Sequence, residues 1–350
     1  MKIKLIILGL VAALIATPLM ACAQGSGAKG EKVDLLIAAG RVGDPWYVMS
    51  EAIAYHVNTD SDRVRATASA TAGMGAARQL LMDNPHGYIG MLGGGIVVQM
   101  PLQEEFKNYG GIKWIASAVP ITWAWVTYDP EIKTIQDFAG KNIGVPRNLS
   151  SWGDIDETIR RSGVYDQVNI HRMGIGGAAQ ALRDGQLDAT YTLVDHIWPG
   201  TFAKGRFITS METKDPIHYV SIPPEILIEM GGAPEAGQLL PAFAELPARV
   251  FPGAFDTKTQ PEAVVVATNP AFLGADEKMD EDIVYEITRI VYEHADDFAQ
   301  WHFMGSNMNK TFLPTYAYIE DVEAVMHPGA LKYYKDNGIE VRNLADLLPR

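Results

Sequence analysis

The sequence has very little cysteine, because Cys22 is the one cysteine in its 350 residues. A chain with one cysteine forms no internal disulfide, and the residues after Cys22 contain neither a thiolate nucleophile nor a Cys-based metal site. Cations are also scarce, with 29 Lys and Arg against 42 Asp and Glu and a formal net charge of −13. Nucleic-acid-binding surfaces need clustered Lys and Arg, so we expect no nucleic-acid partner.

Enzyme motifs are missing from the sequence as well. It contains no G-x-S-x-G elbow, no H-E-x-x-H pair and no G-x-x-x-x-G-K-[ST] loop. Gly174–Gly177 resembles part of a dinucleotide-binding fingerprint but lacks its third glycine, so we interpret it as a strand-to-helix turn. None of the eight histidines forms a pair with metal-ligand spacing, and we interpret His294 as a residue of a helix face and His302 as a helix end. We therefore expect a protein without catalysis, metal or cofactor.

A long membrane-spanning run is absent, although the N-terminus is apolar. Lys2 and Lys4 precede the apolar run Leu5–Ala16, which ends before Pro18 and is shorter than the about 20 apolar residues that a spanning helix needs. A positive start, a short apolar core and a small-residue exit are typical of a secretory signal peptide. We expect residues 1–23 to be this signal and the mature chain to work in the periplasm.

Cys22 lies where two export signals overlap. Ala21–Ala23 has the pattern of an A-x-A cleavage site, whereas Leu19–Cys22 resembles the lipobox of bacterial lipoproteins. The first alternative makes Cys22 an incidental small residue of the signal. The second makes it a lipid-bearing N-terminus, tethered to a membrane through the Gly/Ser/Lys linker at residues 24–32. Composition leaves both alternatives open.

The rest of the chain alternates between short apolar runs and helical stretches. Val33–Ala39 is typical of a buried parallel strand because its apolar residues are nearly continuous. Asp282–Phe298 is the clearest amphipathic helix. Alternation at this spacing predicts βαβ units around parallel sheets. The expected strands are 33–39, 64–70, 87–92, 112–119, 124–128, 141–145, 168–173, 189–194 and 263–268. The other expected helices are 46–57, 71–82, one that opens near residue 150, and 177–184. Residues 231–255 are expected to form an irregular connector.

Two lobes are expected because residues 33–350 exceed what one hydrophobic core usually spans. The predicted fold is α/β, and each lobe is a mainly parallel sheet flanked by helices, with a ligand cleft between the lobes. Residues 33–123 and 269–350 form lobe 1, and residues 124–268 form lobe 2.

Four turns are predicted between strands and helices, at residues 43–46, 71–73, 93–95 and 146–152, and the first three contain glycine. In open α/β sheets such turns lie at the carboxyl ends of the strands, where helix N-termini offer backbone N–H groups to an anion. Arg147 is the one cation in these turns, and the sequence leaves open whether it is a surface residue or a binding residue. Its forked guanidinium group suits a carboxylate. Aromatic side chains lie beside the turns, where core packing and ligand stacking are both open (Trp46, Tyr47 and Trp152).

The most specific motif lies near the C-terminus. His327–Ile339 is similar to the H-P-G-A-x-x-Y-Y-x-x-x-G ending of the TAXI family of TRAP-transporter solute receptors. Ile283–Glu293 resembles the late helix of that family, and Phe138–Val145 resembles its entry to the second lobe. The resemblance runs in order from Ala38 to Ile339.

This resemblance implies a type II periplasmic binding-protein fold, in which crossing strands join two α/β lobes. It implies that a small molecule, usually a carboxylate, is enclosed between the lobes and delivered to a TRAP membrane permease driven by an ion gradient. It implies no catalysis. The ligand-binding residues that it implies are Gly43, Trp46, Tyr47, Thr71, Gly73, Met74, Gly93, Gly94, Gly95, Arg147, Asn148, Ser150, Ser151, Trp152, Asp195 and His196.

The expected binding turns depart from the family pattern. Asp44 and Pro45 stand in the first turn, Ala72–Met74 replaces a usual Gly-Ser pair, and Arg147–Trp152 replaces a Gly-Ser-rich turn. Asp44 and Asp154 would repel an anion at their helix starts unless they only cap the helices. The tryptophans and the methionine favour a bulkier, partly aromatic or apolar carboxylate.

Two other functions stay open at the level of sequence. A ligand-sensing protein of the same fold would report to a membrane signalling receptor, and nothing in the sequence separates sensing from uptake. An exported hydrolase would need paired carboxylates, such as Asp154 and Asp195, about 5–9 Å apart across the cleft. Helix starts and solvated faces already explain the carboxylate pairs of this sequence, so the pattern favours solute binding over hydrolysis.

Overall fold

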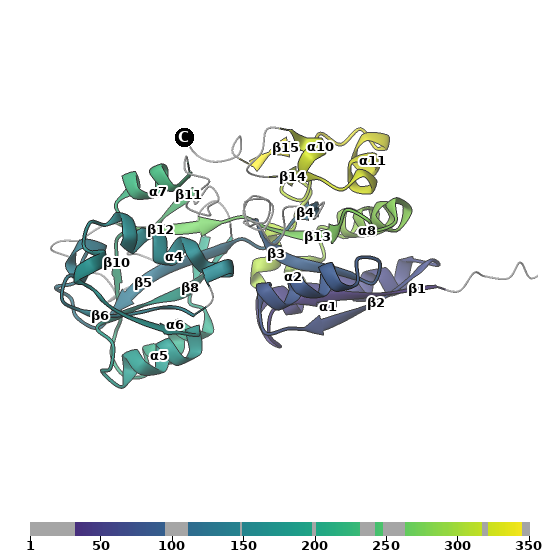
Figure 1. The fold of residues 1–350 in the computed structure, drawn as a ribbon. Helices are drawn as coiled ribbons and strands as arrows, with labels where there is room; N and C mark the ends of the chain where they lie inside the picture. The colour runs from purple at the N-terminus through teal and green to yellow at the C-terminus, as the bar shows by residue number, and fades with distance from the viewer. Residues whose placement is uncertain are drawn as a thin grey trace, which may run out of the picture. The chain divides into compact units, whose positions relative to one another are not determined.

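Five strands form the first main sheet of the computed structural model, which describes residues 32–94, 111–147, 149–197, 201–231, 242–247, 263–316 and 321–344 (Figure 1). In this sheet β1 pairs in parallel with β2 and β3, whereas β13 is antiparallel to both β3 and β4. The strands, in sheet order, are β2 (Val64–Ala70), β1 (Val33–Ala39), β3 (Tyr88–Gly93), β13 (Ala271–Asp276) and β4 (Ile112–Ser117).

Four helices pack with this sheet and bury its apolar side chains. α1 packs against β1 and β2, α2 against β3, and α8 against β4 and α11. The Trp114 ring of β4 stacks on Phe272 of β13 with 4.2 Å between ring centroids, at the centre of this core. The helices are α1 (Pro45–Asp60), α2 (Met74–Asp83), α8 (Glu281–Glu293) and α11 (Pro328–Asp336).

The His327–Ile339 motif has a packing role in this part of the fold. His327 is buried and caps α11, because its Nδ1 accepts a hydrogen bond of 3.2 Å from the backbone N–H of Gly329. Gly329 lies so close to the backbone of Glu281 that a Cβ there would collide with it. Tyr333 and Tyr334 then bury their rings against the same core. The motif therefore fixes the contact between α11 and α8.

The second main sheet has strands running in both directions. Its central path is β11-β12-β5-β8-β6-β7, and β10 pairs with β5 while β9 pairs with β8. Only the pairs of β6 with β7 and with β8 are parallel among the described pairs of this sheet. The strands are β5 (Ile121–Thr127), β6 (Asn142–Pro146), β7 (Asn169–Met173), β8 (Ala189–Ile197), β9 (Thr201–Ala203), β10 (His218–Val220), β11 (Ala242–Pro247) and β12 (Ala263–Asn269).

The chain passes between the two sheets at two places. β4 is followed directly by β5, through residues 118–120, and β12 is followed by β13, through Pro270. Both crossings are short, and Lys32–Arg350 forms one compact unit. The helices that follow strands of the second sheet are α4 (Leu149–Arg161), α5 (Ile175–Arg183), α6 (Arg206–Met211) and α7 (Pro224–Gly231). The remaining described elements are short: η2 (Ile135–Phe138), η3 (Tyr165–Gln167), α9 (Phe298–Trp301), η6 (Phe303–Asn307), β14 (Thr315–Tyr316), α10 (Val322–Val325) and β15 (Arg342–Asn343).

The predicted α/β fold with two sheets flanked by helices is confirmed. The first sheet is mainly parallel as predicted, since β2, β1, β3 and β4 run in the same direction and β13 runs against them. The second sheet departs from the prediction, because antiparallel pairs predominate among its described strands. The connector expected at 231–255 contains a strand, β11, that pairs with β12 along its whole length. The lobe limits stay a prediction. The signal at 1–23, Cys22 and the linker up to residue 31 lie outside the described residues. Within the described ranges, no helix has both the length and the apolar character needed to cross a membrane.

Candidate functional site

A cavity of about 640 Å³ lies where turns from both sheets meet. β1 and β2 end in register, at Ala39 and Ala70, and β6 and β7 end in register, at Pro146 and Met173. The turns after β1 and β2 therefore lie together at one edge of the first sheet, and the turns after β6 and β7 lie together at one edge of the second. Ligands of α/β proteins bind at such edges. The lining residues are Gly40, Arg41, Asp44, Pro45, Trp46, Ala72, Gly73, Met74, Gly75, Ala76, Val119, Pro120, Ile121, Thr122, Pro146, Arg147, Gly174, Ile175, Tyr191, Leu193, Val194, Asp195, Phe207 and Met304.

The binding residues expected from the sequence fall into three groups. The cavity is lined by Trp46, Gly73, Met74, Arg147 and Asp195. Described residues that are not among its lining are Gly43, Tyr47, Thr71, Gly93, Gly94 and His196. Residues Gly95 and Asn148, and the side chains of Ser150, Ser151, Trp152 and Asp154, lie outside the part of the chain that the structure describes.

Trp46 is held in the cavity wall by its indole nitrogen. Its Nε1–H donates a hydrogen bond of 3.0 Å to the carbonyl oxygen of Val119, which lies on the first crossing between the sheets. The indole also packs against a small cluster with Met74 and Ile121. One side of the cavity is therefore apolar and fixed in position.

Thr71 and Gly73 shape the turn before α2. The Thr71 hydroxyl accepts a hydrogen bond of 3.2 Å from the Gly73 backbone N–H. Gly73 has φ of 128°, which favours glycine because it has no Cβ. Gly93 lies behind this turn, where its N–H contacts the Met74 sulfur at 3.1 Å. Thr71 and Gly93 thus position Met74 and Gly73, which line the cavity.

Asp44 is neutralised by an arginine that sequence reasoning did not connect to it. Its Oδ1 lies 2.6 Å from Nη2 of Arg206, at the start of α6. Its Oδ2 accepts a hydrogen bond of 3.0 Å from the Arg41 backbone N–H, and its side chain makes no capping bond to α1. The repulsion of an anion expected from Asp44 is therefore countered by the Arg206 charge.

Two other arginines supply positive charge to the cavity. Within the described ranges, the guanidinium groups of Arg41 and Arg147 make no hydrogen bond or ion pair with other side chains. The Arg147 backbone is fixed instead, because its N–H donates to the Met173 carbonyl oxygen at 3.1 Å. Both forks are free to bind a carboxylate, sulfonate or phosphate group.

Asp195 brings a negative group to the same cavity. It lies near the end of β8, is half-buried, and makes no side-chain hydrogen bond to any described residue. Burial raises the pKa of Asp195 above its ordinary value, and the nearby His302 acts in the opposite direction. An unpaired, partly desolvated carboxyl group suits a hydrogen-bond donor on a solute.

Several lining residues were missed by the sequence reasoning. Arg41 follows Gly40 at the end of β1, and this position after a predicted strand could have marked it. Tyr191, Phe207 and Met304 reach the cavity from β8, α6 and η6. Nothing in their local sequence distinguishes them from core residues, because only the tertiary fold brings them to the cavity.

A family model matches residues 37–338 of this sequence. The chain belongs to the NMT1-like family. The match covers nearly the same residues as the resemblance drawn above from Ala38 to Ile339, and the family that it shows is the NMT1-like family.

No curated protein matches the NMT1-like chain. Among solved structures, it is similar to the periplasmic aliphatic sulphonate binding protein SsuA from Escherichia coli, with 10% identity, coverage of 87% of this chain and 79% of that one, and a TM-score of 0.44. It is similar to a mutant of ArgBP from T. maritima, with 15% identity, coverage of 78% and 93%, and a TM-score of 0.41. An ancestral arginine-binding protein bound to arginine has 16% identity, coverage of 79% and 98%, and a TM-score of 0.38. Similarities this low assign neither a ligand nor a partner to the NMT1-like chain.

His196 of the NMT1-like chain lies inside the protein, where the chain crosses between the sheets. Its Nδ1 and the Thr122 hydroxyl are 2.8 Å apart, and the Thr122 hydroxyl is 2.7 Å from that of Thr268. The His196 ring is fully buried and stacks on Phe202, with 4.2 Å between ring centroids. These contacts link β5, β8 and β12.

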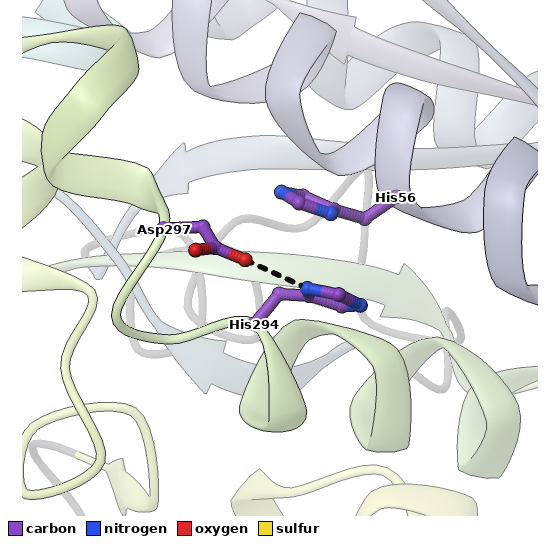
Figure 2. Close-up of side chains that lie close together, drawn as sticks. All are labelled: His56, His294 and Asp297. Atoms are coloured by element: carbon purple, nitrogen blue, oxygen red, sulfur yellow. Dashed lines mark hydrogen bonds and ion pairs between the residues drawn. The ribbon is translucent and has the colours of Figure 1, made fainter.

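A second cluster of ionisable side chains brings together His56, His294 and Asp297, which Figure 2 shows as sticks. One ligand-type atom of each residue lies within 4.8 Å of the others. Sequence spacing gives no sign of this cluster, because His56 and His294 are far apart in the sequence and meet only in the folded chain. His294 is also not on the apolar face of its helix, since α8 ends at Glu293 and His294 caps it with a half-buried side chain.

Proposed function

We propose that this protein is an extracytoplasmic solute-binding receptor that captures a small carboxylate-bearing molecule in the cavity beside Trp46. The observation that carries the proposal is that Arg41 and Arg147, whose guanidinium groups have no side-chain partner in the described ranges, line the same cavity as Trp46 and Met74. A group of fixed positive charge beside aromatic and aliphatic side chains is complementary to an organic anion with an apolar body.

The size and lining of the cavity support a small solute. A volume of about 640 Å³ lies within the range of roughly 300–1,000 Å³ that is usual for small-molecule sites. Trp46, Met74 and Phe207 supply apolar contact, while the backbone at Gly40, Gly73 and Gly174 can approach a ligand closely. Asp195 supplies one carboxyl group, which can accept a hydrogen bond from the solute or, when protonated, donate one. This combination favours a bulky, partly apolar acid over a small dicarboxylate.

Binding without catalysis is the proposed activity. Among the described lining residues, the two carboxyl groups are Asp44, which is paired with Arg206, and Asp195, which is unpaired. The cavity lining contains no histidine, serine or cysteine in the described ranges. Its threonine, Thr122, is buried, and its hydroxyl is hydrogen-bonded to Thr268 and His196 between the strands, so the proposal gives it a packing role. The hydrolase hypothesis based on Asp154 and Asp195 has no support from these contacts.

We propose further that the receptor belongs to the TAXI group within its family and delivers its solute to a TRAP-type permease from the periplasm. The signal-like residues 1–23 and the His327–Ile339 motif support this placement. If Cys22 carries a lipid, the receptor searches for its permease from the membrane surface, which raises its local concentration. Intact-mass measurement of the mature N-terminus separates lipidation at Cys22 from cleavage before Gln24.

A thermal-shift screen of organic acids tests the proposal. A ligand that binds only the folded state adds about 2.7 kcal/mol to the free energy of unfolding at a concentration of 100 times its Kd, so a true solute raises the melting temperature clearly. The screen compares aromatic, branched and short carboxylates, each with its amide as the matched uncharged control. Stabilisation by an acid and not by its amide supports the proposal, and the absence of any stabilising acid contradicts it.

A further inference from the structure

The C-terminal end of α1, which lies away from the cavity, carries ionisable side chains. His56 and Asp60 stand one turn apart, on the same side of the helix. They face the C-terminal end of α8, where His294 is the cap residue, and the start of α9, where Asp297 is the cap residue. Three separate elements thus bring imidazole and carboxylate groups to one place.

His56 is the group in this cluster that lacks a partner. Its ring is 5% exposed, and its Nε2 makes no hydrogen bond although it is buried. A buried polar nitrogen without a hydrogen bond destabilises the fold, so the unpaired Nε2 favours a partner that binds there.

His294 is oriented as a metal-binding histidine usually is. Its Nε2 lies 2.5 Å from Oδ2 of Asp60, and its Nδ1 lies 2.8 Å from Oδ2 of Asp297. Histidine ligands of metals commonly donate their second N–H to a carboxylate, which fixes the ring orientation. With Asp60 holding Nε2–H, Nδ1 of His294 and Oδ2 of Asp297 share a proton in their hydrogen bond, and a cation that displaces this proton would bind the same two atoms. Two tetrahedral ligands with bonds of about 2.0 Å lie roughly 3.3 Å apart, so the two atoms would separate slightly when the cation replaces the proton.

We propose that His56, His294 and Asp297 form a binding site for a divalent transition metal of the zinc type, with Asp60 as the carboxylate that orients His294. Two imidazole nitrogens and one carboxylate oxygen are donors that Zn²⁺ accepts, and a water molecule completes the tetrahedron. The Asp297 side chain is 43% exposed, which leaves the site open to solvent for entry of the ion and the water.

Metal binding requires one local rearrangement. The rings of His56 and His294 are stacked, with centroids 4.0 Å apart and planes 19° from parallel (Figure 2). A metal bound by two histidines lies close to both ring planes, so the His56 ring must turn about its Cβ–Cγ bond. That turn breaks the stacking and gives the buried Nε2 its partner.

The site is structural, and it is separate from the solute cavity. The metal would join α1 to α8 and to the start of α9. The first turn of α1 carries Trp46, and η6, which follows α9, carries Met304, so both joined segments lead to cavity-lining residues. We therefore expect the metal to raise the stability of the chain without binding the solute itself.

Calorimetric titration of untagged, chelator-treated protein with ZnCl₂ tests the site. We expect one ion per chain in the wild type and in His86→Ala, which removes an exposed histidine elsewhere on the first sheet. His294→Ala and Asp297→Asn should each weaken binding at least tenfold, and Asp60→Asn should weaken it by roughly 10- to 100-fold through the orientation of His294. Circular dichroism verifies that each variant is folded.

Cobalt provides a second readout that does not depend on the buried His56. Co²⁺ bound at this site should give the intense visible absorption of a tetrahedral ion, and that absorption should be lost in His294→Ala. No saturable Zn²⁺ binding, or equal binding by wild type and His294→Ala, would overturn the proposal. So would a weak octahedral Co²⁺ spectrum, because that is the signature of loosely held surface carboxylates.

Discussion

The guanidinium of Arg206 lies 2.6 Å from the carboxylate of Asp44, and this ion pair joins the start of α6 to the start of α1. Asp44 lines the cavity, and the neighbour of Arg206, Phe207, does so as well. The pair removes the negative charge that the sequence places at the first turn. In the proposed function, a solute anion would meet the charges of Arg41 and Arg147, which have no side-chain partner among the described residues.

Arg206→Gln should weaken binding of a carboxylate solute, because it leaves Asp44 negative beside the anion. Both side chains of the pair are partly exposed, so a loss of up to roughly fivefold in affinity is expected, corresponding to at most the about 1 kcal/mol typical of exposed ion pairs. Calorimetry at low and at physiological salt measures it, and the loss should be larger at low salt.

Asp44→Asn is the matched variant with the opposite expected sign. It frees Arg206 and removes the negative charge, so affinity for the same acid should stay equal or increase. If both variants weaken binding equally, the pair acts by holding the two helix starts together and not through its charge.

Asp195→Asn should not reduce the stability of the solute-free protein at neutral pH. Burial raises the pKa of Asp195, so the folded chain disfavours its charged form, and stability is lost as pH rises from the unfolded-state pKa through the folded-state one. The amide removes that penalty. Urea unfolding of both proteins at pH 7.5 and below the ordinary aspartate pKa should show the advantage of the variant at the higher pH only, and an advantage of the wild type at pH 7.5 would contradict this account.

His327 should make the protein less stable in mild acid. Burial lowers its pKa from 6.5 to about 4, so between these values the unfolded chain takes up a proton that the folded chain does not. The part of the free energy of unfolding that comes from this pKa difference is fully present above the unfolded-state pKa. It is lost as pH falls toward about 4, with a loss of about 2 kcal/mol at pH 5. Protonation would also remove the Nδ1 acceptor that caps α11.

His327→Asn isolates this effect because asparagine keeps a capping acceptor and does not titrate. The variant should lose less free energy of unfolding between pH 7.5 and pH 5 than the wild type, whereas the exposed-histidine variant His86→Asn should behave as the wild type. Equal losses in the wild type and in His327→Asn would show that other groups cause the acid sensitivity.

Gly329→Ala should destabilise the protein by about 1–3 kcal/mol or more, because the added methyl group meets the backbone of Glu281. Gly177→Ala is the matched control, since Gly177 lies in α5 with no atom near its absent Cβ. Alanine there should raise stability by up to about 1 kcal/mol. Urea midpoints measure both, and a neutral Gly329→Ala would show that α11 can move away from α8.

Local sequence patterns were sufficient for many elements. The continuous apolar run of Val33–Ala39 and the strand at Val64–Ala70 have the expected bounds, and α8 is amphipathic as predicted, with Ile283, Ile287, Ile290 and Val291 buried. Periodicity depends only on which face of an element is buried, so it is readable one element at a time. The predicted end of α8 is wrong, because the chain turns at His294 and resumes helix only at Phe298.

Strand pairing and the sites were beyond such patterns. β13 follows β12 after a single residue, so the apolar runs on either side of Pro270 give no sign that they belong to different sheets. The direction of a strand depends on where the chain crosses from one sheet to the other, and composition does not encode the position of these crossings. In the same way, Arg206 meets Asp44, and His56 meets His294, only through tertiary packing.

The central claim is that Arg147 binds the acid group of the solute, and calorimetry on one variant tests it most directly. The measurement compares the best acid from the thermal-shift screen on the wild type, on Arg147→Gln, and on Arg65→Gln, whose arginine is exposed and paired with Asp34. Loss of a charge-assisted hydrogen bond should weaken binding by about 1.5–3 kcal/mol, roughly tenfold or more, in Arg147→Gln alone. Unchanged affinity in Arg147→Gln, with the acid still bound, would contradict the account.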